Sequence, residues 1–147
     1  MTWSPAATDD SLRILLVEDD DGDAMAVERT FLRGRIAKPI VRALDGVEAL
    51  EILKGTEMQP GLPRPYLLLL DLNLPRMSGI QLTAAIREDP RLHDTVIFVL
   101  TTSNRQQDRK AAYDLNVSGY ILKEKAGDDF QSLFSLVDSY RRIVELP

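Results

Sequence analysis

Four short apolar runs, each ending at a polar residue, constrain the fold of this chain most strongly. Unbroken apolar runs of this length, bounded by turn residues, are typical of strands that a parallel sheet buries on both faces. The polar residues would then lie just beyond the carboxyl ends of the strands, where open α/β sheets bind their ligands. The runs are residues 14–17 before Glu18 and Asp19, 66–70 before Asp71, 96–100 before Thr101, and 120–122 before Lys123.

Helical patterns alternate with these runs, which is the signature of βαβ units. Residues 39–44 are expected to form one more strand, and two helix starts carry capping-box pairs, Asp45 with Glu48 and Ser78 with Gln81. The pattern predicts an α/β fold of five parallel strands and five helices, (βα)5. Helices are expected at 21–33 with a stop at Gly34, after Asp45, from Ser78 to before Pro90, from after Ser103 or Asn104 to about 115, and from after Asp128 nearly to the end.

Residues 12–147 are long enough for a single domain with a substantial core. Residues 1–11 lack the basic-then-apolar pattern of a secretory signal and are expected to form a disordered lead-in. Only 24 residues follow Lys123, so one more helix and no output domain is expected. The stretch 55–65 is long for a helix-to-strand connection and indicates either a tolerated insertion or a partner contact.

Composition excludes several classes of function. The chain has no cysteine, which rules out disulfides, zinc–thiolate sites and thiol catalysis. Its net charge of −5 argues against binding to nucleic acid, for which a basic surface is the rule. No apolar run approaches the roughly 20 residues that a membrane-spanning helix needs. Neither nucleic acid nor membrane is therefore expected as a partner, and the expected location is cytoplasmic.

Acidic residues crowd the end of the first expected strand. Helix capping and compensation of the helix dipole account for Asp20, Asp21 and Asp23. They do not account for Glu18 and Asp19, which directly follow the strand. With Asp71 nearby, these carboxylates would repel one another unless a divalent cation bound them. Mg²⁺ suits carboxylate, carbonyl and water ligands.

Asp71 is the strongest candidate for a residue that takes part directly in a reaction. It closes an apolar run, and no other acidic residue occurs between Glu57 and Glu88. A carboxylate can attack phosphorus to give an aspartyl phosphate, while a cation neutralises charge on the transferring phosphoryl group. The carbonyl group of Asn73, in the loop that follows, is placed to join the metal ligands.

Thr101 and Lys123 complete the expected site. Thr101 is one of four consecutive residues able to cap a helix, but it alone directly follows the strand. A lysine at a strand end is ordinarily a solvated surface residue. Beside the other strand-end groups, the hydroxyl and the ammonium are expected to hold phosphoryl oxygens.

The spacing of these residues resembles that of the CheY-like receiver domain of two-component response regulators. The resemblance covers about residues 12–125, with a consistent closing helix through 144. Asp71 falls on the phosphoacceptor position, 30 residues before Thr101 and 52 before Lys123. The other matching positions are the acidic pair Glu18 and Asp19, the aromatic switch position Tyr120, and the loop residues Pro75 and Gly79.

The resemblance implies a flavodoxin-like, doubly wound sheet and a phosphoacceptor function. A sensor histidine kinase would phosphorylate Asp71, and the domain would signal by conformational change and protein contacts rather than act as a metabolic enzyme. It would assist its own phosphorylation and dephosphorylation. Mg²⁺ would be held by Glu18 through water, Asp19, Asp71 and the Asn73 carbonyl, and the switch pair would be Thr101 and Tyr120.

More loosely, residues 55–65 and 100–103 resemble the stand-alone regulators that accompany bacterial phytochrome kinases. One position departs from the family, because Glu124 follows Lys123 where proline is usual, often after a cis bond. A cis bond without proline costs roughly 2.5–4 kcal/mol, so a trans bond and a different path before the fifth helix are expected.

Three other functions fit parts of the sequence. An aspartyl-nucleophile phosphatase of the haloacid dehalogenase type needs a general acid two residues after the nucleophile, where this chain has Asn73. A flavodoxin-like cofactor binder needs a first turn that cradles phosphate, whereas residues 18–21 are all acidic. The third alternative is a receiver-like domain that binds a partner without being phosphorylated. Against it, every position that the phosphoryl chemistry needs carries a suitable residue.

The fifth helix predicts a second contact surface. Four of its residues have core spacing, and three others form a second apolar line. A helix with two apolar sides needs two partners, so a homodimer through the fourth helix, fifth strand and fifth helix is expected, with Tyr113 joining it. The alternative is that the second line packs under the carboxyl-terminal tail. The core set is Phe130, Leu133, Phe134 and Val137, and the second line is Leu136, Tyr140 and Ile143.

Overall fold

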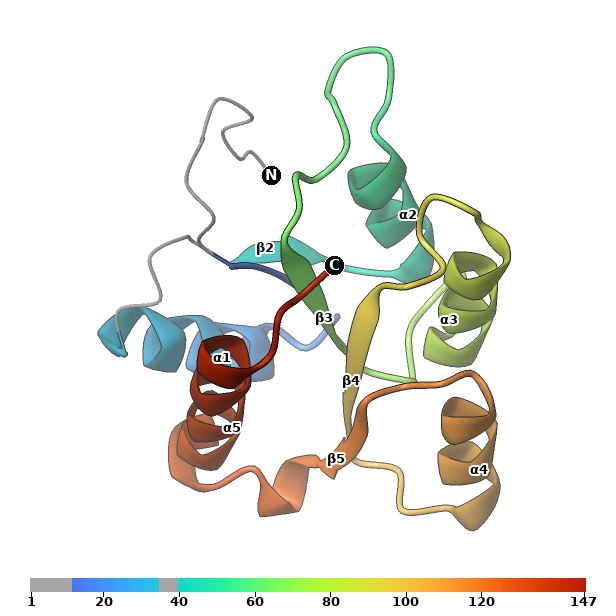
Figure 1. The fold of residues 1–147 in the computed structure, drawn as a ribbon. Helices are drawn as coiled ribbons and strands as arrows, with labels where there is room; N and C mark the ends of the chain where they lie inside the picture. The colour runs from blue at the N-terminus through green and yellow to red at the C-terminus, as the bar shows by residue number, and fades with distance from the viewer. Residues whose placement is uncertain (1–11, 35–39) are drawn as a thin grey trace.

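Five parallel strands form one sheet with helices on both faces (Figure 1), in a computed structural model that describes residues 12–34 and 40–147. The predicted (βα)5 order is confirmed, while the expected lead-in at 1–11 lies outside the described residues. No described helix is both long and apolar enough to cross a bilayer. The elements are β1 (Arg13–Val17), α1 (Asp21–Arg33), β2 (Val41–Ala43), α2 (Gly46–Lys54), β3 (Tyr66–Leu70), α3 (Gly79–Glu88), β4 (Val96–Thr101), α4 (Gln106–Asp114), β5 (Gly119–Leu122), the 3₁₀ turns η1 (Lys123–Lys125) and η2 (Asp128–Phe130), and α5 (Gln131–Ile143).

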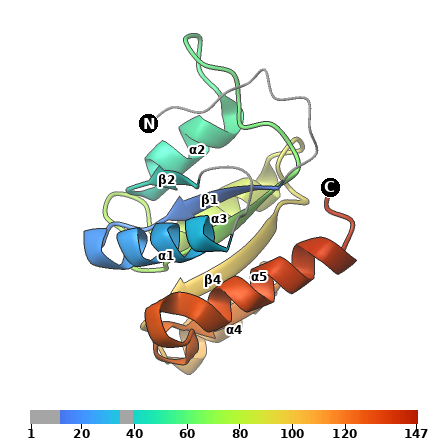
Figure 2. The same ribbon diagram turned by 90° about the vertical axis from the view of Figure 1, so that its left-hand side faces the viewer.

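The sheet has the strand order β2-β1-β3-β4-β5, which is the doubly wound, flavodoxin-like arrangement that was predicted. Helices α1 and α5 cover one face, and α2, α3 and α4 cover the other (Figure 2). Apolar residues on the two faces of the strands form two cores. The carboxyl ends of β1, β3, β4 and β5 therefore meet at one edge of the sheet.

Burial on both faces is confirmed for the first three apolar runs but not for the fourth. All residues of β1 and β3, and all but the first of β4, are buried. Every residue of β5 is only half-buried, because β5 is an edge strand with a neighbour on one side alone.

Most helix starts are set by local side chains, as the sequence predicted. Asp45 accepts a hydrogen bond from the Glu48 amide at 2.9 Å, and Ser78 forms a complete capping box with Gln81. Helices α4 and α5 are the exceptions, since neither has a side-chain cap. Helix α5 begins at Gln131, after η2, rather than directly after Asp128. Helix α4 begins at Gln106 rather than directly after Ser103 or Asn104. The cause is that Ser103 donates its hydroxyl to Asp108 instead of capping the first turn.

The Lys123–Glu124 peptide bond is trans, as the sequence predicted, because the one cis bond among the described residues is Arg64–Pro65. The chain after Lys123 does not run straight into α5. It makes the turns η1 and η2, and Asp129 and Phe130 have φ angles of 52° and 62°. Such left-handed backbone is uncommon outside glycine, and α1 holds it in place. Thr30 donates to the Asp129 carbonyl at 2.6 Å, and Arg29 and Arg33 each pair with the Asp129 carboxylate at 2.7 Å.

Helix α1 ends with Gly34 as its cap, as predicted, and the need for a glycine at this position arises from a contact far along the chain. Its φ angle is −77°, which any residue adopts. A Cβ atom at Gly34 would lie 2.0 Å from the ring of Phe134 in α5. Packing of α5 against α1 thus excludes a side chain here.

The long connection 55–65 is anchored to the domain in its second half. Leu62 is buried in the core and its amide donates to the Ile52 carbonyl at 2.9 Å. Arg64 donates to the Arg91 carbonyl and to Asp94, both at 2.9 Å. Met58, at the tip, is almost fully exposed. The connection is therefore anchored to the domain by Leu62 and Arg64, while residues 56–58 and Pro60 are exposed.

Candidate functional site

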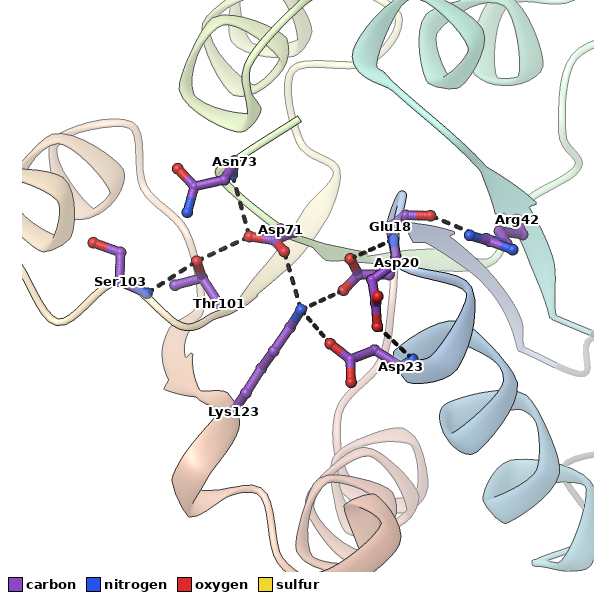
Figure 3. A network of polar contacts seen from close by, with 9 residues as sticks. All are labelled: Glu18, Asp20, Asp23, Arg42, Asp71, Asn73, Thr101, Ser103 and Lys123. Carbon is purple, nitrogen blue, oxygen red and sulfur yellow. Dashed lines mark hydrogen bonds and ion pairs between the residues drawn. The ribbon is translucent and has the colours of Figure 1, made fainter. Parts of the chain in front are cut away.

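Asp71 lies at the centre of the polar groups that end the strands (Figure 3). Its Oδ1 accepts hydrogen bonds from the Thr101 hydroxyl at 2.9 Å and from the Asn73 amide at 3.2 Å. Its Oδ2 accepts one from Lys123 Nζ at 3.1 Å. Asp71 and Thr101 are both buried. The structure thus brings together the residues that the apolar runs singled out.

Three carboxylates gather at this edge of the sheet. Glu18, Asp19 and Asp71 each offer an oxygen atom within 4.8 Å of the others. Glu18 is only 2% exposed, and burial raises its pKa to about 6, assisted by the charge of Asp71 and opposed by the hydrogen bond from Lys123. Clustered carboxylates of this kind are a donor set for a hard divalent cation. The residues present therefore fit the predicted metal site.

Lys123 balances the negative charge of this cluster. Its Nζ donates to Glu18 at 2.8 Å, to Asp23 at 2.7 Å and to Asp71 at 3.1 Å, and its side chain is 11% exposed. Burial alone would lower the pKa of the ammonium, but the hydrogen bonds to Asp23 and Glu18 and the charge of Asp71 outweigh it. The pKa is raised, and the group stays a cation.

The role of Asp23 is missed by the sequence reasoning, which assigned it to helix capping. Asp20 is the cap of α1, and it accepts the Asp23 amide at 2.8 Å. The Asp23 carboxylate instead contacts Lys123, 100 residues further along. No local sequence pattern predicts the Asp23–Lys123 pair, because the pair forms only when η1 lies beside the first turn of α1.

The two residues at the expected switch positions, Thr101 and Tyr120, are connected through Ser103. Thr101 contacts Asp71 directly, and its Oγ1 also accepts the Ser103 amide at 3.3 Å. The Tyr120 hydroxyl donates to the Ser103 carbonyl at 2.9 Å, and burial raises the pKa of Tyr120. Tyr120 therefore touches the β4–α4 loop rather than Asp71 itself.

Neighbouring turns fix the loop that follows Asp71. A Cβ atom at Gly79 would lie 2.4 Å from the Asp71 carbonyl oxygen, so α3 begins in close contact with the site. Arg76 binds Asp45 through two hydrogen bonds of 2.8 and 3.0 Å, which lower the pKa of Asp45. The loop is thus tied to the start of α2.

This arrangement is suited to phosphoryl transfer. The Asp71 carboxylate can act as the nucleophile. The Thr101 hydroxyl, at the end of β4, contacts its Oδ1, and the Lys123 ammonium, at the start of η1, contacts its Oδ2. Catalysis of this reaction is mostly positioning and charge stabilisation. The protein groups supply both.

Comparisons with known proteins agree with this chemistry. The chain matches the model of the response regulator receiver domain over residues 14–134. It is 34% identical to the response regulator Rcp1 of Synechocystis over 127 residues, 86% of each chain.

Two solved structures extend the comparison. A Mn²⁺-bound form of Rcp1 superposes with a TM-score of 0.81, at 34% identity and over 92% of this chain and 98% of that one. A phosphorylated cyanobacterial phytochrome response regulator, RcpA, gives 0.76 at 33% identity, over 92% and 97%.

These matches give no support to a haloacid dehalogenase-type phosphatase, whose nucleophile would lie on the first strand. They agree with the flavodoxin-like arrangement of five parallel strands. The chain belongs to the response regulator receiver domain family, and it is a signalling component of the two-component type, whose partners are histidine kinases.

Proposed function

We propose that residues 12–147 act as one receiver unit that accepts a phosphoryl group on Asp71 from a sensor histidine kinase, with Mg²⁺ as the cofactor. The observation that carries this proposal is the environment of Asp71. Its two oxygens contact Thr101 and Lys123, and the acidic cluster lies beside it.

In the reaction, the phosphoryl group passes from the imidazole nitrogen of the kinase histidine to a carboxylate oxygen of Asp71. The P–N bond breaks, an acyl phosphate forms, and the imidazole leaves as the neutral base after proton transfer. The Thr101 hydroxyl and the Lys123 ammonium hold phosphoryl oxygens. Mg²⁺, held by Glu18 through water, Asp19, Asp71 and the Asn73 carbonyl, would neutralise phosphoryl charge. The same groups would assist both phosphorylation and dephosphorylation.

The proposal is tested by incubating the protein with a small phosphodonor such as acetyl phosphate, or with a phosphorylated kinase, and measuring intact mass. We expect one phosphoryl group in the presence of Mg²⁺ and none with EDTA. Absence of labelling by every donor in Mg²⁺ would overturn the proposal.

Asp19→Asn is expected to weaken Mg²⁺ binding strongly. Asp19 is the exposed member of the acidic cluster, so its replacement removes a charged ligand while disturbing little packing. Titration calorimetry measures the effect, with Asp114→Asn as the control, since Asp114 is exposed and pairs only with Lys110 among the described residues. Unchanged affinity in Asp19→Asn would place the cation elsewhere.

Thr101→Ala is expected to accept phosphate on Asp71 but to transmit it poorly. Thr101 links Asp71 to the Ser103 segment, which in turn binds the Tyr120 hydroxyl. A phosphoryl group shifts an equilibrium only by its differential contacts with the two states, and this variant loses such a contact. Partner affinity is measured with and without a phosphoryl mimic, and equal tightening in wild type and variant would show that the signal leaves by another route.

The kinase partner proposed here is a bacterial phytochrome, acting in the cytoplasm. Support comes from RcpA, which is described as a phytochrome response regulator and is 33% identical to this chain. A panel of phosphorylated kinases, some with phytochrome sensors and some without, tests this point. Faster transfer from the kinases without such sensors would contradict it.

A homodimer through α4, β5 and α5 is also proposed. Tyr113, Leu136 and Ile143 are 48%, 42% and 81% exposed. Tyr140 packs edge-on against Phe98, with ring centroids 5.1 Å apart, so only two residues of the second apolar line are free. We expect a dimer by sedimentation at micromolar concentration that Ile143→Glu weakens. A monomer with and without phosphorylation would refute it.

A further inference from the structure

Asp23 has no part in the function proposed above, yet it makes a short contact with Lys123. The distance is 2.7 Å, against 3.1 Å for Asp71. A lysine ammonium has three N–H donors, and here three carboxylates accept them: Glu18, Asp23 and Asp71 (Figure 3). Asp23 therefore accepts one of the three N–H donors of the Lys123 ammonium.

Asp23 differs from the other two partners in its position. Glu18 and Asp71 belong to the cluster of converging carboxylates, together with Asp19, and Asp23 is not part of that group. A cation bound by the cluster would compete with Lys123 for Glu18 and Asp71. The Lys123 side chain is 11% exposed, so releasing it without another counter-ion would leave a poorly solvated charge, which is costly.

The start of α1 holds Asp23 in a suitable place. Its amide donates to the Asp20 carboxylate in the cap of the helix, and its own carboxylate points across to Lys123 (Figure 3). The carboxylate is thus fixed on a regular element beside the acidic cluster.

We propose that Asp23 is a positioning residue for Lys123. It holds the ammonium on the α1 side of the site, so that a divalent cation can take Glu18 and Asp71 while Lys123 keeps an anionic partner and stays within reach of Asp71. This inference rests on the proposed function, because it assumes that the carboxylate cluster binds Mg²⁺.

The test compares Asp23→Asn with Asp21→Asn by calorimetric titration of Mg²⁺. Both variants lose one charge from the first turn of α1, but Asp21 is exposed and pairs with Arg42. We expect Asp23→Asn to weaken Mg²⁺ binding about fivefold more than Asp21→Asn, a size usual for coupled neighbouring groups. The difference should persist at high salt, which screens the long-range effect of Asp21.

A double-mutant cycle separates positioning from simple charge. In a Lys123→Met background, Asp23→Asn should weaken Mg²⁺ binding no more than Asp21→Asn does. The ¹⁵N signal of the Lys123 ammonium should also broaden in Asp23→Asn but not in Asp21→Asn. Thermal melting checks that each variant is folded. If Asp23→Asn melts at a lower temperature than the wild type, Asp23→Ser takes its place.

Two results would overturn the inference: equal loss of affinity in the two variants at every salt concentration, or an undiminished effect of Asp23→Asn without Lys123. Failure of the wild type to bind Mg²⁺ or to be labelled would instead refute the proposed function.

Discussion

Asp71→Asn is expected to reduce phosphorylation by an acyl phosphate or a phosphorylated kinase to background, with the fold intact. The amide oxygen still accepts the hydrogen bonds from Thr101 and Asn73, so packing around the strand end is preserved. The nucleophilic carboxylate is lost, and no other described group is placed between the Thr101 hydroxyl and the Lys123 ammonium. Intact-mass analysis after incubation with Mg²⁺ and donor measures the effect.

Asp114→Asn is the matched control for this variant. It makes the same chemical change at an exposed position of α4, where Asp114 pairs with Lys110, and it should be labelled like the wild type. Thermal melting should show that Asp71→Asn is folded. The variant also loses the repulsion between Asp71 and Glu18, which contributes to the raised pKa of Glu18. Undiminished labelling of Asp71→Asn would contradict the assignment of the phosphoacceptor.

Lys123→Met is expected to destabilise the metal-free protein strongly and to make its stability depend on Mg²⁺. The change leaves Glu18, Asp23 and Asp71 without their shared cation in a site that is mostly buried. Removing one partner of a buried ion pair typically costs roughly 3–5 kcal/mol. Mg²⁺ should restore part of this stability, and it should bind more tightly than in wild type, because Lys123 no longer competes for two of the carboxylates.

Chemical denaturation in EDTA and in Mg²⁺ tests this expectation, with Lys110→Met as the control. Lys110 pairs with Asp114 on the exposed surface of α4, where an i,i+4 pair contributes only about 0.3–0.5 kcal/mol. Similar losses in the two variants, or no rescue by Mg²⁺, would show that Lys123 does not neutralise the cluster.

The pH dependence of the metal-free protein follows from Glu18. Its folded-state pKa, about 6 against an ordinary 4.5, means that the folded state binds this proton more readily than the unfolded state does. The contribution to stability is therefore fully present below about 4.5 and is lost as pH rises through about 6. In Lys123→Met the upper end of this range should rise, because the hydrogen bond that lowers the folded-state pKa of Glu18 is gone.

The sequence by itself determined the strands and most members of the site, with the exception of Asp23. Apolar runs and capping pairs act between neighbours, so the strand ends and the starts of α2 and α3 were readable in the printed order. Because parallel strands bring their carboxyl ends to one edge, the convergence of Asp71, Thr101 and Lys123 followed from the pattern alone. The role of each of these three residues stays a prediction until the phosphorylation and mutation experiments are done.

Only the tertiary structure decided which partners those groups have. Asp23 turns to Lys123, and Asp129 binds Arg29 and Arg33, across about 100 residues of chain. These pairs exist because α1 and α5 share one face of the sheet, which also forces the glycine at position 34 beside Phe134. Local propensity carries no information about such neighbours, since they are set by strand order and helix packing rather than by adjacent residues.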